Sequence, residues 1–320
     1  MIDLLVDLKK DYCDYVKGEV EYLKSLGFLF PKRMVDSEYE ISEYFNLLER
    51  IPSQFPRRIY KAKGFSCPKD SKNGLCRLEE DIIAGNSLFK YLSKRIFQAD
   101  YSDGMKFDFG ISHFHLGTVP DAGCTQLVKR TANVLYAVYT DDAFYFLAVD
   151  KHGRWNDLRL IEIIAESFPE LLKTHEINNI KSLQPGLTEK QRKTLRENHV
   201  NTFIHLDGKL YSSPGGGVSS NGFSTNATFK FIRQMSFLMR LEEQIKIFFA
   251  SNHSLEFSLP DVSRLELHYA TFSKPMILFD TKLQYKFEID WDQKNIIPIR
   301  IYYVSTSDLF WKKKFFLYCL

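Results

Sequence analysis

Long apolar runs are missing from this sequence: no uncharged stretch approaches the roughly 18 residues that a transmembrane helix needs. The start of the chain also lacks the basic lead and apolar centre of a signal peptide, because Asp3 and Asp7 lie among its first residues. We therefore expect a cytoplasmic protein with no membrane partner.

Cysteine is scarce and scattered. The five cysteines are Cys13, Cys67, Cys76, Cys124 and Cys319, an odd-numbered set without a C-x-x-C pair. This spacing argues against both a disulfide framework and a zinc ribbon. The sequence predicts free thiols.

Tryptophan is rare, with 3 residues, whereas the chain has 27 phenylalanines and 17 tyrosines. The hydrophobic content of 44% and the charged content of 26% are typical of a globular protein, so we expect aromatic-packed cores. The net charge of +3 indicates no partner, but residues 1–50 are rich in acids and residues 57–95 in bases that alternate with aromatics. That basic stretch fits contact with a nucleic-acid backbone and fits a solvated surface equally well.

The first 56 residues are expected to form an N-terminal helical arm. Apolar residues recur at helical spacing over residues 3–26, before Gly27. A capping box, Ser37 with Glu40 three residues later, then predicts a second helix over residues 37–50.

Residues 57–253 are expected to form a core of mixed helices and strands. The apolar runs 134–139 and 143–149, joined by a short turn, predict an antiparallel hairpin, and the run 108–117 predicts another strand. Helices are predicted over 78–97 with an interruption near Gly85, over 158–172 with a break at Pro169, and over 225–250. A second capping box, Thr188 with Gln191, predicts a short basic helix over 188–199, and a second hairpin is predicted over 202–211.

Residues 254–320 alternate in the manner of strands and predict a β-rich C-terminal region. The predicted fold class is therefore α+β. We expect a central antiparallel sheet flanked by helices, with the N-terminal helical arm before it and the β-rich region after it.

A histidine pair is the main candidate for chemistry. His113 and His115 lie in the aromatic run from Asp108 to Gly117, and in a strand they would project from the same face. His152 follows a strand of the same predicted sheet, so all three histidines could meet at one end of it. Arg130 and Asp108 complete this constellation.

Two chemistries would use these residues. In metal-free phosphodiester cleavage, one histidine takes a proton, another protonates the leaving oxygen, and Arg130 or Lys151 stabilises the phosphorane; an ordinary pKa of about 6.5 suits both transfers. In a metal site, His-x-His and a distant histidine or aspartate would hold zinc or manganese with an open position. The third interpretation is structural: one histidine is a satisfied core residue, and the pair lies under aromatic neighbours.

A glycine-rich loop over residues 212–222 precedes the last predicted helix. Its triplet, Gly215, Gly216 and Gly217, would let the backbone approach a ligand, and the helix start offers N–H groups to an anion. The loop lacks a P-loop lysine and dinucleotide spacing, so we assign no nucleotide site. The alternatives are contact with phosphate or nucleic acid and a structural connection that needs positive φ.

Several motifs follow one another in a recognisable order: Tyr91-Leu92-Ser93-Lys94, Asp108–Gly117, Leu135–Val138, His152, Trp155, Phe168-Pro169 and Gly215–Ser224. Over roughly residues 57–250 the chain resembles a widespread, mostly uncharacterised bacterial family with an HFHLG motif and a later GGG segment. Phe109 and Phe168 stand where that family has tryptophan. Such proteins resemble the cargo of mobile elements and defence regions, which implies effectors acting on nucleic acid. The hairpin followed by His152 more distantly resembles RelE-type ribonuclease toxins, which are far shorter.

Taken together, these features predict a nuclease-like effector of a bacterial defence or toxin–antitoxin system that acts on RNA or DNA. The candidate catalytic residues are His113, His115, His152 and Arg130, and the candidate substrate-binding residues are Lys94, Lys151, Gly215, Gly216 and Gly217. No metal ligand is assigned, and the cofactor is left open. The alternative is a non-catalytic component of a defence complex that binds nucleic acid or a protein partner such as an antitoxin.

Overall fold

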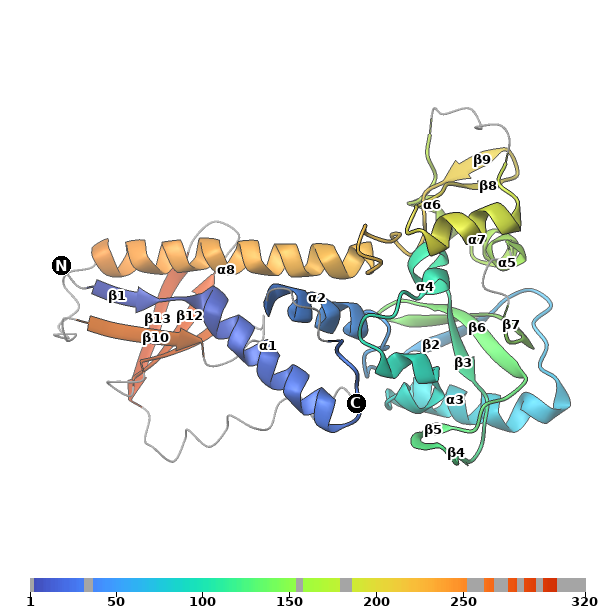
Figure 1. The fold of residues 1–320 in the computed structure, drawn as a ribbon, viewed down its shortest axis with the longest axis horizontal. Helices are drawn as coiled ribbons and strands as arrows, with labels where there is room; N and C mark the ends of the chain where they lie inside the picture. The colour runs from blue at the N-terminus through green and yellow to red at the C-terminus, as the bar shows by residue number, and fades with distance from the viewer. Residues whose placement is uncertain are drawn as a thin grey trace. The chain divides into compact units, whose positions relative to one another are not determined.

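The structure is a computed structural model that describes residues 3–31, 37–153, 158–178, 186–251, 262–267, 276–280, 285–291 and 296–303. The chain divides into two compact units (Figure 1). The five-stranded unit draws its described residues from 1–26, 34–41 and 230–317, and the four-stranded unit from 27–33 and 42–229. Each unit is named after its largest sheet.

The five-stranded unit combines the two ends of the described chain. Its sheet has the order β1 (Asp3–Val6), β10 (Val262–Leu267), β11 (Met276–Asp280), β12 (Tyr285–Trp291) and β13 (Ile296–Tyr303). β1 lies parallel to β10, and the other neighbours are antiparallel. The units therefore differ from the three consecutive regions 1–56, 57–253 and 254–320 expected from the sequence, because the first strand pairs with a partner beyond residue 260.

Helix α1 (Leu8–Ser25) follows β1. Asp7 caps it, since its side chain accepts a hydrogen bond from the backbone N–H of Lys10, a group that has no partner within the helix. Leu8, Val16 and Val20 are fully buried on one face. The predicted helix over 3–26 is wrong at its start, where residues 3–6 form β1 and gain a strand partner.

The four-stranded unit is built on a mixed sheet with the order β2 (Arg58–Lys61), β7 (Ala143–Lys151), β6 (Asn133–Tyr139) and β3 (Ser112–His115). The hairpin β6–β7 and the pair β3–β6 are antiparallel, as predicted. β2 lies parallel to β7, with Arg58 opposite Ala143, so the sheet is mixed rather than wholly antiparallel. The predicted α+β class is confirmed, and Figure 1 shows helices flanking this sheet.

One face of this sheet packs against helices that follow β7. Leu160, Ile161 and Ile164 of α5 (Arg159–Ser167) share a buried cluster with Val134 and Tyr136 of β6. Pro169 separates α5 from the short α6 (Glu170–Lys173), which is the predicted break.

The structure has further helices and strands. They are α2 (Ser37–Leu48), η1 (Lys69–Ser71), α3 (Lys72–Ala84), η2 (Phe89–Tyr91), η3 (Lys94–Phe97), β4 (Pro120–Asp121), β5 (Cys124–Val128), α7 (Glu189–Glu197), β8 (Ile204–Leu206), β9 (Lys209–Tyr211) and α8 (Thr225–Ser251). The capping box of α7, between Thr188 and Gln191, is present as predicted. The interruption predicted near Gly85 is confirmed, because Gly85 in the left-handed region ends α3. α3 begins earlier than predicted, and the short helices η2 and η3 take the place of the predicted second piece.

The run from Asp108 to Gly117 is only partly a strand. Asp108 and Phe109 end α4 (Gly104–Phe109), and β3 covers residues 112–115 alone. Asp103 caps the start of α4 by accepting from the N–H of Lys106, and Gly110, with φ of 72°, ends it. The prediction of a strand over the whole run is therefore wrong, and the reversal at Gly110 turns the chain from α4 into β3.

No helix in the described part of the chain is both long and apolar enough to cross a membrane. Cys13, Cys67, Cys76 and Cys124 are free thiols, as predicted. Cys319 and Trp155 lie outside the described residues.

Candidate functional site

Strand register brings the three histidines together. Within the antiparallel pair β3–β6, His113 lies opposite Tyr136 and His115 opposite Val134, so the two imidazoles share a face with these two residues. Val134 in turn lies opposite Asp150 of β7. His152 follows β7 directly, and its N–H donates to the carbonyl of Ala132 at 3.0 Å. The site therefore spans two strands that flank β6.

The three side chains converge at one end of the sheet, as predicted. One ring nitrogen from each of His113, His115 and His152 lies within 4.8 Å of the other two. The ring centroids are 5.3 Å apart for His113 and His152, 5.5 Å for His115 and His152, and 5.7 Å for His113 and His115. This is the spacing of a cluster rather than of three separate surface residues.

The cluster is held in its uncharged form. Burial, the nearby imidazole of His152 and Arg130 lower the pKa of His113 to about 3. Burial, His113 and Arg130 likewise lower the pKa of His115 to about 3, although Asp121 acts in the opposite direction. The pKa of His152 is lowered by burial and Arg130. These values differ from the ordinary histidine pKa that the acid–base interpretation assumed, and a neutral imidazole is a poor proton donor.

His115 is the innermost member. Its side chain is 2% exposed, and both of its ring nitrogens are buried without a hydrogen-bond partner in the described residues. A satisfied core histidine would have such a partner. The structural interpretation therefore leaves this imidazole unexplained.

A cavity of about 590 Å³ opens beside the cluster, and His113, His152, Arg130 and Ser112 contribute to its wall. Its other charged lining residues are the bases Arg50, Arg95, Lys106, Lys193 and Arg196 and the acids Asp103 and Glu197. Bases outnumber acids on this wall, so the cavity presents a positive field to a solute. An anionic ligand is the kind that this field favours.

Not every one of these bases is available to a ligand. The guanidinium of Arg50 is buried and donates to the carbonyls of Asn46, Arg95, Gln98 and Ala99. Burial lowers its pKa to about 10, so it stays charged at neutral pH. Arg50 therefore contributes charge to the wall while it joins α2 to the segment around η3.

Two predicted substrate-binding lysines lie outside the described lining of this cavity. Lys94 of η3 pairs with Asp121 at 2.7 Å, whereas its neighbours Ser93 and Arg95 do line the cavity. Lys151 ends β7, where its carbonyl accepts from the hydroxyl of Tyr136. Of the predicted bases, Arg130 is the one that the structure places beside the histidines.

The backbone N–H groups of the triple glycine are all hydrogen-bonded to backbone carbonyls. The N–H groups of Gly215, Gly216 and Gly217 donate to the carbonyls of Asp108, Ser213 and Phe107 respectively. A Cβ on Gly215 would lie 2.2 Å from the carbonyl oxygen of Lys106. These contacts favour the structural alternative for the loop, because two of its amides bind α4 and the third binds within the loop.

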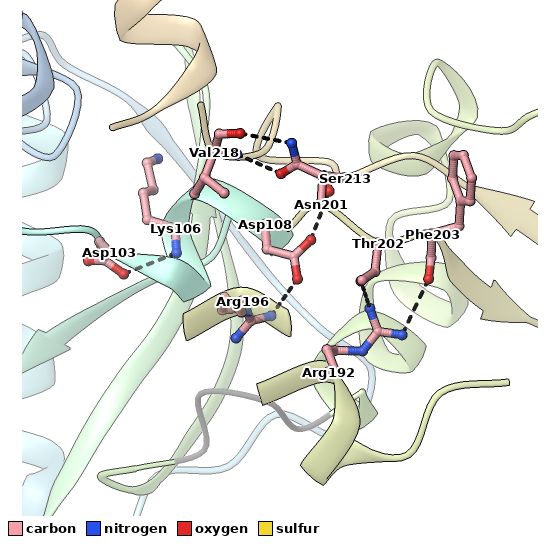
Figure 2. A network of polar contacts seen from close by, with 10 residues as sticks. All are labelled: Asp103, Lys106, Asp108, Arg192, Arg196, Asn201, Thr202, Phe203, Ser213 and Val218. Carbon is pink, nitrogen blue, oxygen red and sulfur yellow. Dashed lines mark hydrogen bonds and ion pairs between the residues drawn. The ribbon is translucent and has the colours of Figure 1, made fainter. Parts of the chain in front are cut away.

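Asp108 joins the loop to α7 instead of joining the histidines. Figure 2 shows its carboxylate between Arg196 and Ser213: Arg196 Nη2 donates to Oδ2 at 2.5 Å, and Ser213 Oγ donates to Oδ1 at 2.8 Å. In the same view Asn201 bonds to both backbone polar groups of Val218. This network fixes α7, whose Lys193 and Arg196 reach the cavity.

The sequence predicts α7 only as a short basic helix and does not indicate that its residues belong to the site. Arg95 and Lys106 also line the cavity without having been predicted as site residues. The one usable signal for α7 was its run of basic residues after the Thr188 capping box. The side of the cavity that α7 lines is set by the ion pair between Asp108 and Arg196. These two residues are 88 positions apart in the sequence, so local spacing does not predict the contact.

No family model, curated protein or solved structure matches the chain. The site is therefore defined by its own geometry: a cluster of three uncharged imidazoles in an α+β unit, of which His113 and His152 line a basic cavity and His115 is buried behind them.

Proposed function

We propose that this protein is a nuclease-like effector that cleaves phosphodiester bonds of RNA or DNA at the cluster of His113, His115 and His152. The observation that carries the proposal is the convergence of these imidazoles beside Arg130, with His113 and His152 on the wall of a basic cavity. The resemblance of residues 57–250 to a family associated with bacterial defence and mobile elements supports the role of effector.

Charge favours a phosphodiester as the substrate. Each linkage of a nucleic acid carries one negative charge, and Lys and Arg supply most of the affinity for it. In the reaction, water or a 2′-hydroxyl gives its proton to a neutral imidazole of the cluster, and its oxygen bonds to phosphorus. The bond to the leaving sugar oxygen breaks, and that oxygen takes up a proton from solvent. Arg130 is placed to stabilise the additional negative charge of the transition state.

A non-catalytic role is the second candidate, because the imidazole of His115 is only 2% exposed and so offers little access to a substrate. In that case the protein would bind nucleic acid or a protein partner of a defence complex. The histidines would then take no part in a reaction.

The two candidates differ in what a histidine substitution removes. His152 is the exposed member of the cluster, so His152→Ala is the variant that leaves the fold intact. We expect this variant to cleave single-stranded RNA or DNA at least about 100-fold more slowly than the parent, which is the low end for loss of a general acid or base.

His205→Ala is the matched control, because His205 belongs to the separate hairpin β8–β9 of the same unit. It should cleave at the parent rate. Equal rates for the parent and His152→Ala, or no cleavage of either nucleic acid by the parent, would contradict the proposal. If the parent binds an oligonucleotide without cleaving it, the binding role is correct.

A further inference from the structure

The arrangement of donor atoms at the histidine cluster points to a ligand beyond the substrate. Three imidazoles each direct a ring nitrogen to within 4.8 Å of the others, and no second group of three or more metal-ligating side chains occurs among the described residues. His115 is buried with neither ring nitrogen hydrogen-bonded in the part of the chain that the structure describes. We propose that His113, His115 and His152 bind one divalent transition-metal ion, of the zinc class, with an open coordination position toward the cavity.

The distances fit this ligand set. Zinc binds imidazole nitrogen at about 2.0–2.1 Å, so the nitrogens of a tetrahedral site lie about 3.3 Å apart. The nitrogens here are within 4.8 Å of one another, so small rotations of the imidazoles would close the site. Three histidines and a fourth position for water or substrate are a common set for catalytic zinc.

The buried imidazole of His115 gives the second reason. A buried polar group without a partner destabilises the fold, because it has lost its hydrogen bonds to water. A bond from one of its nitrogens to a metal ion would satisfy that nitrogen and account for the burial. A neutral imidazole is also the form that a metal ion requires.

The charged residues around the cluster indicate which kind of molecule would take the open position on the metal ion. Arg130 lies near all three histidines and Asp121 near His115, while Lys94 pairs with that aspartate. Neutral histidines leave the full charge of a divalent ion uncompensated. The ion and Arg130 would therefore bind an anionic oxygen ligand together, such as the phosphoryl oxygens of a phosphodiester.

Metal binding does not depend on nucleic acid being the substrate, so it can be tested separately. The full chain, without a histidine tag, is first treated with EDTA, freed of the chelator and titrated with Zn²⁺ by calorimetry, and then with Co²⁺ and Mn²⁺. We expect one Zn²⁺ per chain, and a d–d absorption spectrum of tetrahedral Co²⁺ that Zn²⁺ displaces.

His152→Ala removes the exposed ligand and should weaken Zn²⁺ binding at least 10-fold. His205→Ala, the control on β8, should bind Zn²⁺ as the parent does. Circular dichroism confirms that both variants are folded. Absence of stoichiometric binding by the parent, or equal affinity of His152→Ala and the parent, would overturn the inference.

The two proposals fail in different ways. A parent that binds Zn²⁺ with the expected histidine dependence but cleaves no nucleic acid would contradict the proposed function alone. A parent that cleaves nucleic acid in EDTA and binds no metal ion would contradict the metal site alone and favour the acid–base interpretation.

Discussion

Asp108 lies close to the histidine motif in the sequence, but its side chain contacts a different part of the structure. Its carboxylate accepts from both Arg196 and Ser213, and the side chains of Asp108 and Arg196 are only 10% and 11% exposed. Breaking a buried ion pair leaves one charge without compensation, which is far more costly than losing a surface pair. The pair thus fixes Arg196 at the cavity wall.

We predict that Asp108→Asn lowers the free energy of unfolding by about 3 kcal/mol, because the guanidinium of Arg196 stays buried while its counter-charge is removed. Urea unfolding followed by circular dichroism measures the change. Glu197→Gln is the matched control on the same helix, since the Lys193–Glu197 pair is exposed and 3.8 Å apart. The control should change stability by less than about 0.5 kcal/mol. An equal loss of unfolding free energy in the two variants would show that the buried ion pair contributes no more to stability than the exposed one.

At the residue scale, the sequence does not predict the environment of each histidine. The His-x-His spacing predicted that His113 and His115 share a face, and the register against β6 agrees with it. The low pKa values arise from burial and from Arg130, which reaches the cluster from the connection between β5 and β6. Spacing along a strand contains no information about either.

At the element scale, the glycine triplet is the clearest case of a motif whose role is steric. Gly215 lies against α4, where an added Cβ would come within 2.2 Å of the carbonyl oxygen of Lys106 and 2.4 Å of that of Phe107. Both of these contacts are with backbone atoms, which cannot turn aside as a flexible side chain can. The close approach thus requires glycine.

We predict that Gly215→Ala destabilises the four-stranded unit by about 2 kcal/mol or more, in the range of other overpacked substitutions. Thermal unfolding provides the measurement. Gly186→Ala is the control, because nothing lies within 4 Å of a Cβ at that position. It should leave the unfolding temperature within about 2 °C of the parent. A Gly215→Ala variant as stable as this control would mean that the loop does not pack on α4 as described.

Local patterns predicted the elements that are complete in themselves. The hairpin β6–β7, the capping box of α7 and the break at Pro169 each depend on residues within one short segment. The error over Asp108–Gly117 arose because an aromatic run fits a strand and a short helix alike. The cap at Asp103 and the stop at Gly110 were the signals for α4, and both are visible in the sequence.

At the scale of the whole molecule, pairing between distant segments decided what the sequence could not show. Residues 3–6 are apolar enough to continue the helix that follows, and they form β1 because β10 lies beside them. The basic wall of the cavity has a similar origin. Its residues come from the turn after α2, from η3, α4 and α7, and from the connection before β6, so no single stretch of sequence contains the pattern.

The charge gathered on this wall leads to a prediction about salt. If the cavity binds a nucleic-acid backbone, log Kd for a labelled single-stranded oligonucleotide should rise linearly with log salt concentration, by about 0.7 per phosphate contact. Arg130→Gln removes a base from the wall, so it should weaken binding and lower this slope by about 0.7. Fluorescence anisotropy measures both effects between 50 and 200 mM NaCl, roughly the range over which such contacts weaken. The measurement uses the His152→Ala background, where cleavage does not interfere.

Arg58→Gln is the control, because Arg58 lies on β2 in an exposed ion pair with Asp142, outside the described lining of the cavity. A slope lowered equally by both substitutions would indicate a general surface charge effect, and an unchanged slope in Arg130→Gln would place the nucleic acid elsewhere on the protein.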